Sequence, residues 1–238
     1  MIFYKKLNPI YAITFDLDDT LYENTSIIVQ AERSLLDFMH DKYPVTKQLD
    51  KGFWRKQTKF HILTNPQLKN DMSALRRLSL QSGFKELGFS GNKLDIATQD
   101  CYQHFYFQRS NFSLNENIYS LLTTLSQKLP LIAITNGNVN LQQLGIDSLF
   151  VASFKANLTM PMKPDKAMFS AAQSFLNLPC KNILHVGDNL SKDIYGALKA
   201  GDQAAWYAEY RSMNLNHEKT QLLPHVQLSK LQQLLEII

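Results

Sequence analysis

The sequence predicts an α/β fold, in which a Rossmann-like parallel sheet forms the core and an all-helical segment is inserted into it. The first sign is a set of short apolar runs that end at polar residues or glycine, as buried parallel strands do. The second is the alternation of helical and strand patterns from residue 114 onward, which is typical of crossover connections. The third is residues 22–113, which lose β character and show helical periodicity.

The helical insert is predicted over residues 22–113, between the two parts of the core, residues 1–21 and 114–238. Thr25 or Ser26 is a suitable cap for its first helix, whose apolar residues follow helical spacing. Later helices are predicted over residues 72–81 and 94–109, and nearby glycines mark the turns.

The core elements follow from short apolar runs and from helical periodicity between them. The predicted strands are residues 12–15, 131–135, 150–154, 183–186, 204–207 and 225–228. The predicted helices are residues 116–128, 165–176 and 191–200. Residues 214–224 are predicted to form a polar loop.

The composition indicates a globular protein with enough apolar residues for a buried interior. Hydrophobic residues make up 45% of the 238 residues, which allows one large domain or a core with a smaller insertion. The formal net charge of +4 favours anionic substrates but falls well short of the basic surface of a nucleic-acid-binding protein. We therefore expect no nucleic-acid partner.

The cysteines and the N-terminal residues indicate in which cellular compartment the protein is expected. Cys101 and Cys180 lie far apart without metal-type spacing, so two reduced thiols in a cytosolic protein are favoured over a disulfide. Lys5 and Lys6 precede only a short apolar stretch ending at Asp16, which fits neither a signal peptide nor a membrane span. We expect a cytoplasmic protein without membrane partners, either a monomer or a weak homodimer.

The first motif is the acidic run Asp16-Leu17-Asp18-Asp19-Thr20, which directly follows the first strand. Carboxylates this close raise one another's pKa, so their clustering suggests a bound cation or a reaction. Asp16 and Asp18 are two residues apart, so in extended geometry their side chains leave the same side of the backbone. The alternative is an exposed acidic turn, which suits Asp19 alone.

The second motif is Thr135-Asn136-Gly137, at the end of the strand predicted over residues 131–135. A hydroxyl can donate to an anion, and glycine lets backbone N–H groups approach the anion closely. The alternative is a plain strand-to-turn transition.

The third motif is Lys163-Pro164-Asp165, just ahead of an apolar helix. Proline suits the first turn of a helix, so Lys163 is predicted to lie at the N-terminal end, where the helix dipole and the ammonium group both attract phosphate. Lys155 is the competing lysine and ranks lower because no helix start follows it. A solvated lysine is the alternative for either position.

The fourth motif spans residues 183–193 and brings Asp188 and Asp193 to the end of another strand. Asp188 is the candidate ligand for Mg²⁺, which prefers oxygen ligands in octahedral geometry. Helix N-capping is the alternative for both aspartates. His185 lies within the strand, and a core histidine with satisfied hydrogen bonds is the favoured interpretation over a catalytic one.

These four motifs, in this order, resemble those of the haloacid dehalogenase-like hydrolases, whose first motif is Asp-x-Asp-x-Thr after an apolar strand. The resemblance covers the whole chain and implies a Rossmann-like catalytic core with a helical cap that governs substrate specificity. It implies a Mg²⁺ cofactor held by Asp16, the backbone carbonyl of Asp18, and Asp188. It also implies that Asp193 is not itself a metal ligand but orients a metal-bound water or Lys163.

The resemblance also implies roles in phosphoryl transfer. Asp16 would attack phosphorus and form an aspartyl-phosphate, while Asp18 would protonate the leaving group and then activate a water molecule. Thr135 and Lys163 would bind phosphate oxygens. The remaining implied substrate-binding positions lie in the two loops after the first two core strands: Leu17, Asp19, Thr20, Asn136 and Gly137. Asp19 and Thr20 would also shape the first of these loops.

The implied activity is Mg²⁺-dependent hydrolysis of a small-molecule phosphate monoester. A haloacid dehalogenase needs neither a metal nor a general acid, so the presence of Asp18, Lys163 and Asp188 argues against it. A phosphomutase would share all four motifs and is a further alternative. A non-catalytic binding protein is disfavoured, because it has no reason to keep every polar catalytic group.

The implied substrate depends on the cap. Within the family, the motif segments resemble phosphatases of flavin mononucleotide and of the phosphorylated ribitylaminouracil intermediate of riboflavin synthesis. The chain departs from them at residues 160–162 and in much of the cap, so another sugar phosphate or a nucleotide is the alternative. Cap aromatic residues could stack on a planar ring, but core packing is the favoured interpretation for them. Cap arginines could reach a polar tail, and a solvated helix face is an equally good interpretation for them. These aromatic residues and arginines include Phe53, Trp54, Phe60, Phe84, Phe89, Tyr102, Phe105, Tyr106, Phe107, Arg55, Arg76, Arg77 and Arg109.

Overall fold

The chain divides into two compact units. The computed structural model describes residues 1–208, 210–218, 220 and 222–238. The core unit consists of Met1–Asn24, Ser113–Gly137 and Leu144–Ile238, and the cap unit consists of Thr25–Phe112 and Asn138–Gln143.

Residues 138–143 pack with the cap helices, although the sequence pattern assigned them to the core range. Polar contacts account for this difference, because the Asn140 N–H donates to Ser110 Oγ at 2.9 Å and the Gln143 side-chain amide donates to the Phe107 carbonyl at 2.9 Å. The sequence gives no sign of these contacts, since they join residues at least 30 positions apart.

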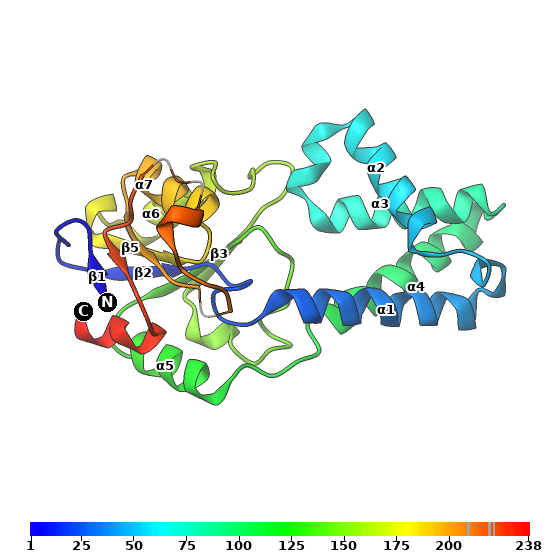
Figure 1. The fold of residues 1–238 in the computed structure, drawn as a ribbon. Coiled ribbons are helices and arrows are strands. Elements are labelled where there is room, and N and C mark those ends of the chain that lie inside the picture. The colour runs from blue at the N-terminus through cyan, green and yellow to red at the C-terminus, as the bar shows by residue number, and fades with distance from the viewer. Residues whose placement is uncertain (209, 219, 221) are drawn as a thin grey trace. The chain divides into compact units, whose positions relative to one another are not determined.

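Within the described residues, seven strands form one sheet in the order β1-β7-β6-β5-β2-β3-β4 (Figure 1). Their bounds are β1 Ile2–Phe3, β2 Ala12–Phe15, β3 Leu131–Thr135, β4 Ala152–Lys155, β5 Ile183–Gly187, β6 Gln203–Trp206 and β7 Val226–Gln227. β1 runs antiparallel to β7, and the other strand pairs are parallel. The predicted α/β fold is confirmed, as are the six predicted strands to within two residues at each end.

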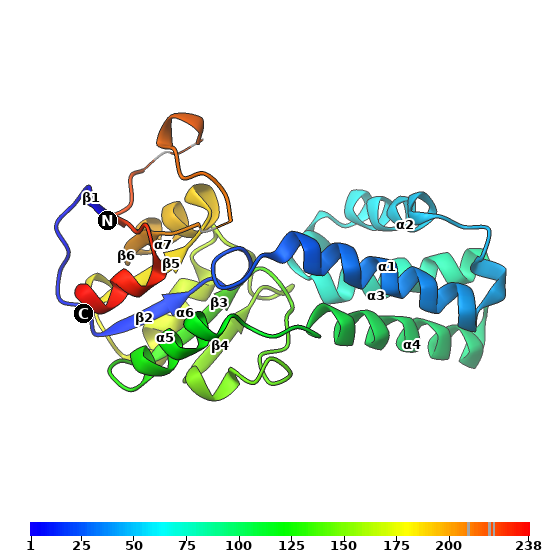
Figure 2. The ribbon, with the colours of Figure 1, turned by 60° about the horizontal axis from the view of Figure 1, so that its bottom comes forward.

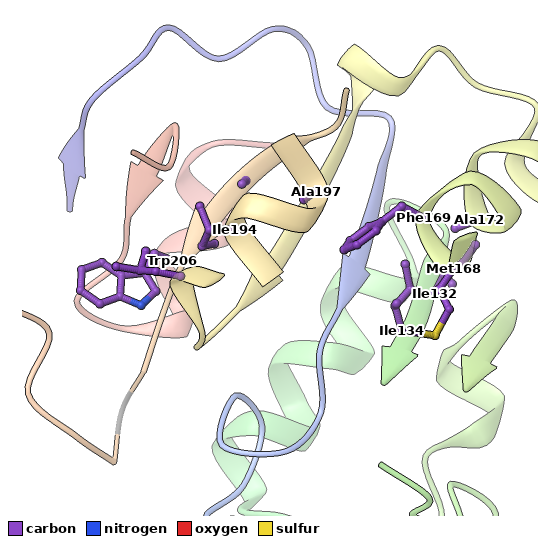
Figure 3. Close-up of a cluster of buried hydrophobic side chains, with 10 residues drawn as sticks. Ile132, Ile134, Met168, Phe169, Ala172, Ile194, Ala197 and Trp206 are labelled. Carbon is purple, nitrogen blue, oxygen red and sulfur yellow. The ribbon is translucent and has the colours of Figure 1, made fainter. Parts of the chain in front are cut away.

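The core helices cover both faces of this sheet (Figure 1). Helix α5 (Glu116–Ser126) lies on one face, and α6 (Ala167–Leu176) and α7 (Tyr195–Ala200) lie on the other. Figure 3 shows the apolar cluster beneath α6, where Ile132 and Ile134 of β3 contact Met168 and Phe169. All four side chains are fully buried. This packing fixes the sheet edge from which the polar motifs emerge.

The third motif differs from its prediction, because α6 begins at Ala167 and not at Asp165. Lys163 and Pro164 therefore lie in a turn before the helix, and the bond between them is cis. Asp165 Oδ1 accepts a hydrogen bond from the Ala167 N–H at 2.8 Å, which satisfies a backbone donor at the helix start. Lys163 does not lie at a helix N-terminus, so the helix dipole does not explain its position.

The helix predicted over residues 191–200 also differs from its prediction. A π-helical turn, Leu190–Ile194, precedes α7, and Asn189 caps it through hydrogen bonds from the N–H groups of Ser191 and Lys192. Asp193 is therefore not the N-cap. Of the predicted polar loop 214–224, residues 219 and 221 lie outside the described residues, and Leu215–His217 form a 3₁₀ turn.

Residues 25–112, all of which the structure describes, form the helices of the cap (Figure 2). Their bounds are α1 Asn24–Lys42, α2 Lys51–Thr64, α3 Met72–Glu86 and α4 Gly91–Arg109. The helices predicted over residues 72–81 and 94–109 are confirmed. Helix α2 was not predicted, because Gln57 is its only buried residue and its apolar face is weak. Asp50 caps it by accepting from the Gly52 and Phe53 N–H groups.

No helix among the described residues has the length and apolar character needed to span a membrane.

Asp202 offers a test of the core packing between α7 and β6. It is 2% exposed, its Oδ1 accepts from the Gln173 side-chain amide at 2.8 Å, and its Oδ2 has no hydrogen-bond partner among the described residues. Burial raises the pKa of Asp202 to about 7. Because this exceeds the ordinary value of about 3.9, the folded state loses stability as pH rises from 4 to 7.

We expect Asp202→Asn to raise the free energy of unfolding by roughly 1–3 kcal/mol at pH 8, because it removes a buried charge but keeps the acceptor. At pH 4 the gain is expected to be much smaller. Urea unfolding at the two pH values measures this difference. An equal or greater gain at pH 4 would contradict the assignment.

Candidate active site

The polar motifs meet at one edge of the sheet, because β2 lies between β5 and β3 and all three strands are parallel. Phe15, the last residue of β2, pairs with Ala133 on one side and with Val186 on the other. The Asp16 N–H donates to the Val186 carbonyl at 2.9 Å, which extends the pairing by one residue. Ligands of open α/β sheets bind beyond such carboxyl ends.

Lys163 binds Asp16 and Asp193 in the centre of this edge. Its Nζ lies 2.5 Å from Asp16 Oδ1, 2.7 Å from Asp193 Oδ1 and 2.7 Å from the Ile134 carbonyl oxygen. The three charged residues are each at most 6% exposed. An ammonium group has three N–H donors, so these contacts account for all of them.

The ionisation of this cluster follows from burial and mutual contact. Burial works against the ammonium form of Lys163, but the contacts with Asp16 and Asp193 outweigh it and raise the pKa of Lys163. Burial would raise the pKa of Asp193, yet Lys163 and His185 hold that pKa below its usual value. Burial raises the pKa of Asp16 well above its usual value, Lys163 opposes this shift, and nearby Asp193 and Asp18 add to it. Asp193 is thus a carboxylate, and additional positive charge would favour ionised Asp16.

In the acidic loop after β2, the carboxyl groups of Asp18 and Asp19 have different partners. Tyr22 Oη donates to Asp18 Oδ1 at 2.5 Å. A Cβ placed on Gly137 would lie 2.4 Å from Asp18 Oδ2, so only glycine permits this approach of Asp18 to the second motif. Asp19 has a positive φ of 62°, and its Oδ1 accepts from the Asn24 N–H at 2.9 Å, so this side chain shapes the turn.

Thr20 also contacts the cluster, because its hydroxyl donates to Asp16 Oδ2 at 3.1 Å. Leu17, whose side chain is fully buried, anchors the acidic loop through its carbonyl, which accepts from the N–H groups of Thr20 and Leu21. Both oxygens of Asp16 therefore have a donor, one from Lys163 and one from Thr20.

The second motif positions Lys163 through Asn136. The Lys163 N–H donates to Asn136 Oδ1 at 2.7 Å, and Asn136 Nδ2 donates to the Lys163 carbonyl at 3.1 Å. Thr135 Oγ1 accepts from the Gly137 N–H at 2.9 Å. This reciprocal pair of bonds holds the turn that carries Lys163 against β3. The sequence implied a substrate-binding position for Asn136 and gave no sign that its side chain holds Lys163.

Lys155, the competing lysine, is half-buried on β4 and pairs in register with Thr135 of β3. Burial lowers the pKa of Lys155. Lys163 is the lysine whose amine the structure places between Asp16 and Asp193.

Asp188 completes a group of carboxylates that could hold a metal ion. Oxygen atoms of Asp16, Asp188 and Asp193 all lie within 4.8 Å of one another. Burial raises the pKa of Asp188 to about 7, Asp193 adds to the shift, and Arg211 opposes it. Both oxygens of Asp193 are engaged, Oδ1 by Lys163 and Oδ2 by the Asn189 N–H at 3.0 Å, and both oxygens of Asp16 are likewise engaged by Lys163 and Thr20. Such hard oxygen donors suit Mg²⁺.

The backbone of Asp188 is held by residues that follow β5 in the chain. Its carbonyl accepts from Trp206 Nε1 and from Arg211 Nη2, both at 2.7 Å. Arg211 Nε also lies 3.7 Å from Asp188 Oδ2. Neither contact was predicted, since the chain order gives no sign that residues 18 and 23 positions downstream return to this strand end.

This arrangement agrees with comparison to known proteins, since the family model for haloacid dehalogenase-like hydrolases matches residues 10–201. That span contains all four motifs. The chain belongs to this hydrolase family.

Relatives of this hydrolase align over most of their length. The 5-amino-6-(5-phospho-D-ribitylamino)uracil phosphatase YigB of Escherichia coli is 31% identical over 238 residues, which is 100% of both chains. The N-acylneuraminate-9-phosphatase of Homo sapiens is 24% identical over 237 residues, 96% of this chain and 93% of that protein. The crystal structure of 2-haloacid dehalogenase from Pseudomonas syringae pv. Tomato DC3000 superposes with a TM-score of 0.88 and 28% identity, covering 96% and 97% of the two chains.

The cap of the hydrolase uses most of its aromatic residues for packing. Phe84, Tyr102 and Phe105 are at most 6% exposed. The guanidinium group of Arg76 lies 3.5 Å from the ring centroid of Phe105, and that of Arg77 lies 4.0 Å from the ring centroid of Tyr102. Phe84, Tyr102 and Phe105 follow the packing interpretation, and Arg76 and Arg77 stack on two of these rings. They are engaged within the cap itself.

A cavity of about 540 Å³ lies within the cap, between residues of α1, α2 and α3. Leu36, Met39 and Ile62 supply apolar walls, and Trp54 and Arg55 also line it. The volume falls in the range of small-molecule pockets.

Substituting the two lysines tests which of them serves the site. We expect Lys163→Met to lower hydrolase activity about 10²–10³-fold, because it removes the positive charge beside Asp16. We expect the same change to lower the free energy of unfolding by roughly 3–5 kcal/mol, because two buried carboxylates lose their cation. Steady-state kinetics and urea unfolding measure the two effects.

Lys155→Met is the matched control, and it is expected to keep activity within about threefold. A greater loss of activity in Lys155→Met than in Lys163→Met would contradict the assignment of Lys163.

Proposed function

We propose that this hydrolase is a Mg²⁺-dependent phosphatase that forms an aspartyl-phosphate on Asp16. The observation that carries the proposal is the buried contact between Asp16 and Lys163, with Asp18 two residues away against Gly137. A carboxylate held beside a fixed cation is placed to attack an anionic phosphoryl group.

The chain's own residues account for two successive displacements. An Asp16 oxygen attacks phosphorus, the bond from phosphorus to the ester oxygen breaks, and Asp18 gives its proton to the leaving oxygen. A water molecule then attacks phosphorus and loses its proton to Asp18, which releases inorganic phosphate and restores Asp16. Lys163 and the Thr135 hydroxyl stabilise the negative charge on the phosphoryl oxygens in both steps.

The donor set fits a divalent cation. Asp16, Asp188 and the backbone carbonyl of Asp18 would hold Mg²⁺, which supplies positive charge that stabilises the transferring phosphoryl group. Asp193 stays outside this set in the proposal, where its contacts with Lys163 and the Asn189 N–H give it the role of orienting Lys163.

Phosphatase activity is preferred over dehalogenation for a chemical reason. Dehalogenation needs the nucleophile, but it has no use for a general acid at Asp18 or a metal ligand at Asp188. The full-length relative at 31% identity is a phosphatase, whereas the structural relative at 28% identity is a 2-haloacid dehalogenase. Both activities are therefore included in the test below.

The proposed substrate is flavin mononucleotide or 5-amino-6-(5-phospho-D-ribitylamino)uracil. The alignment with YigB over the full length of both chains supports the latter compound, which is the one that the name of YigB gives. A phosphorylated sugar acid is the second candidate, supported by the 24% identical N-acylneuraminate-9-phosphatase.

Phosphate release with excess Mg²⁺ tests the substrate and the reaction together. We expect kcat/KM for the two riboflavin-related phosphates to exceed that for N-acylneuraminate 9-phosphate by about tenfold or more, since this chain is 31% identical to the riboflavin-pathway phosphatase and 24% identical to the sugar acid phosphatase. Chelation of the metal and the Asp16→Asn variant are each expected to abolish the activity.

Asp19→Asn is the matched control, because Asp19 lies in the same loop and contacts Asn24. Its activity is expected to stay within about tenfold of the parent. Chloride release from 2-chloropropionate, or phosphate release that survives both chelation and Asp16→Asn, would contradict the proposal. A preference for the sugar acid phosphate would contradict the proposed substrate but not the proposed reaction.

A further inference from the structure

His185 lies directly behind the site, in the middle of β5, and the proposed reaction does not use it. The residue is fully buried and pairs in register with Thr14 of β2. Its Nδ1 lies 2.8 Å from Thr14 Oγ1, and its Nε2 lies 3.5 Å from Asp193 Oδ1. The Phe169 ring meets the imidazole edge to face at a centroid distance of 5.0 Å, which restricts rotation of the imidazole.

The protonation state of His185 follows from its neighbours. Burial lowers the pKa of His185, and Lys163 adds to the shift while Asp193 opposes it, so the imidazole is neutral at neutral pH. A neutral imidazole has one N–H donor and one bare nitrogen. Asp193 is a carboxylate that can only accept, so the donor faces it from Nε2. The bare Nδ1 then accepts the Thr14 hydroxyl proton.

Several groups hold the Asp193 side chain, and each contact affects the position of the Lys163 amine. Its Oδ1 faces both His185 and the Lys163 amine, and its Oδ2 accepts from the Asn189 N–H. A Cβ on Gly187 would lie 2.4 Å from the Asp193 Cβ, so the backbone of β5 closes off another side. The contact chain runs from Thr14 through His185 and Asp193 to Lys163, which binds Asp16.

We propose that His185 is a positioning residue, which fixes the Asp193 carboxylate through its Nε2–H and thereby holds the Lys163 amine at Asp16. Its effect on catalysis rests on the proposed function, but its tautomer and contacts do not. Without this donor, Asp193 loses one of the groups that orient Oδ1, and Lys163 gains freedom to move away from Asp16. The expected consequence is slower chemistry without weaker substrate binding.

Two amide substitutions separate positioning from packing. The amide nitrogen of glutamine reaches the place of His185 Nε2 and preserves a donor toward Asp193, whereas the shorter asparagine reaches only the place of Nδ1. We expect His185→Asn to lower kcat about 10–100-fold with KM unchanged, and His185→Gln to stay within about threefold of the parent. Thr14→Val, which removes the hydroxyl that orients the ring, is expected to fall between them.

His225→Gln is the matched control, because His225 is a half-buried core histidine whose Nδ1 accepts from the Ala204 N–H at 3.2 Å, away from Asp193. It is expected to leave kcat unchanged. Melting temperatures are measured for all variants. The proposal would be overturned if His185→Asn had the same kcat as the parent. It would also be overturned if both amide variants lost kcat in proportion to their loss of melting temperature.

Nitrogen-15 NMR of the histidine side chains in the full chain tests the proposal without any substrate. The sequence has six histidines, and comparison with His185→Gln assigns the signal of His185. We expect a neutral ring with the proton on Nε2, and a mixture of tautomers in Thr14→Val. A proton on Nδ1 would overturn the proposal. If the tautomer is as expected but no phosphate is released from any substrate, the proposed function fails and the Nε2–H contact stands.

Discussion

The buried ammonium group of Lys163, between the carboxylates of Asp16 and Asp193, is the interaction on which the site depends. Its three contacts at 2.5–2.7 Å draw together residues from four places in the chain. Ionised Asp16, Asp188 and Asp193 carry three negative charges, which exceed the positive charges of Lys163 and of Arg211, 3.7 Å from Asp188. A divalent cation offsets this excess, so the same cluster that organises the site also explains why Mg²⁺ would bind there.

The sheet order makes this interaction possible. Asp16 and Lys163 are 147 residues apart, and they meet because β2 is placed between β5 and β3, with the strand ends on one edge. Asn136 at the end of β3 then holds the turn of Lys163 through two hydrogen bonds. Asp193 is held from behind by His185 and from the side by Asn189. Each charged group is thus fixed by a neighbour on a rigid element, which favours catalysis by preorganisation.

Local patterns in the sequence were sufficient for the six parallel strands and for the motifs at their ends, whereas the short antiparallel strand β1 was not predicted. Residues 12–15 and 131–135 match β2 and β3 in full, because continuous apolar runs are typical of buried parallel strands. Helix α2 was missed because it buries little, and Lys163 was expected at a helix start that begins only at Ala167. The contacts of His185 with Thr14 and of Asn136 with Lys163 join residues 171 and 27 positions apart, and no local pattern indicates them.

The central claim is that Asp16 is the nucleophile beside the Lys163 ammonium group. The most direct measurement is rapid acid quenching of a single turnover with substrate and Mg²⁺, followed by peptide mass spectrometry. We expect one phosphoryl group on the peptide that contains Asp16, formed and lost at rates consistent with turnover. Product release with no phosphorylated peptide, or a phosphoryl group on a different residue, would contradict this account.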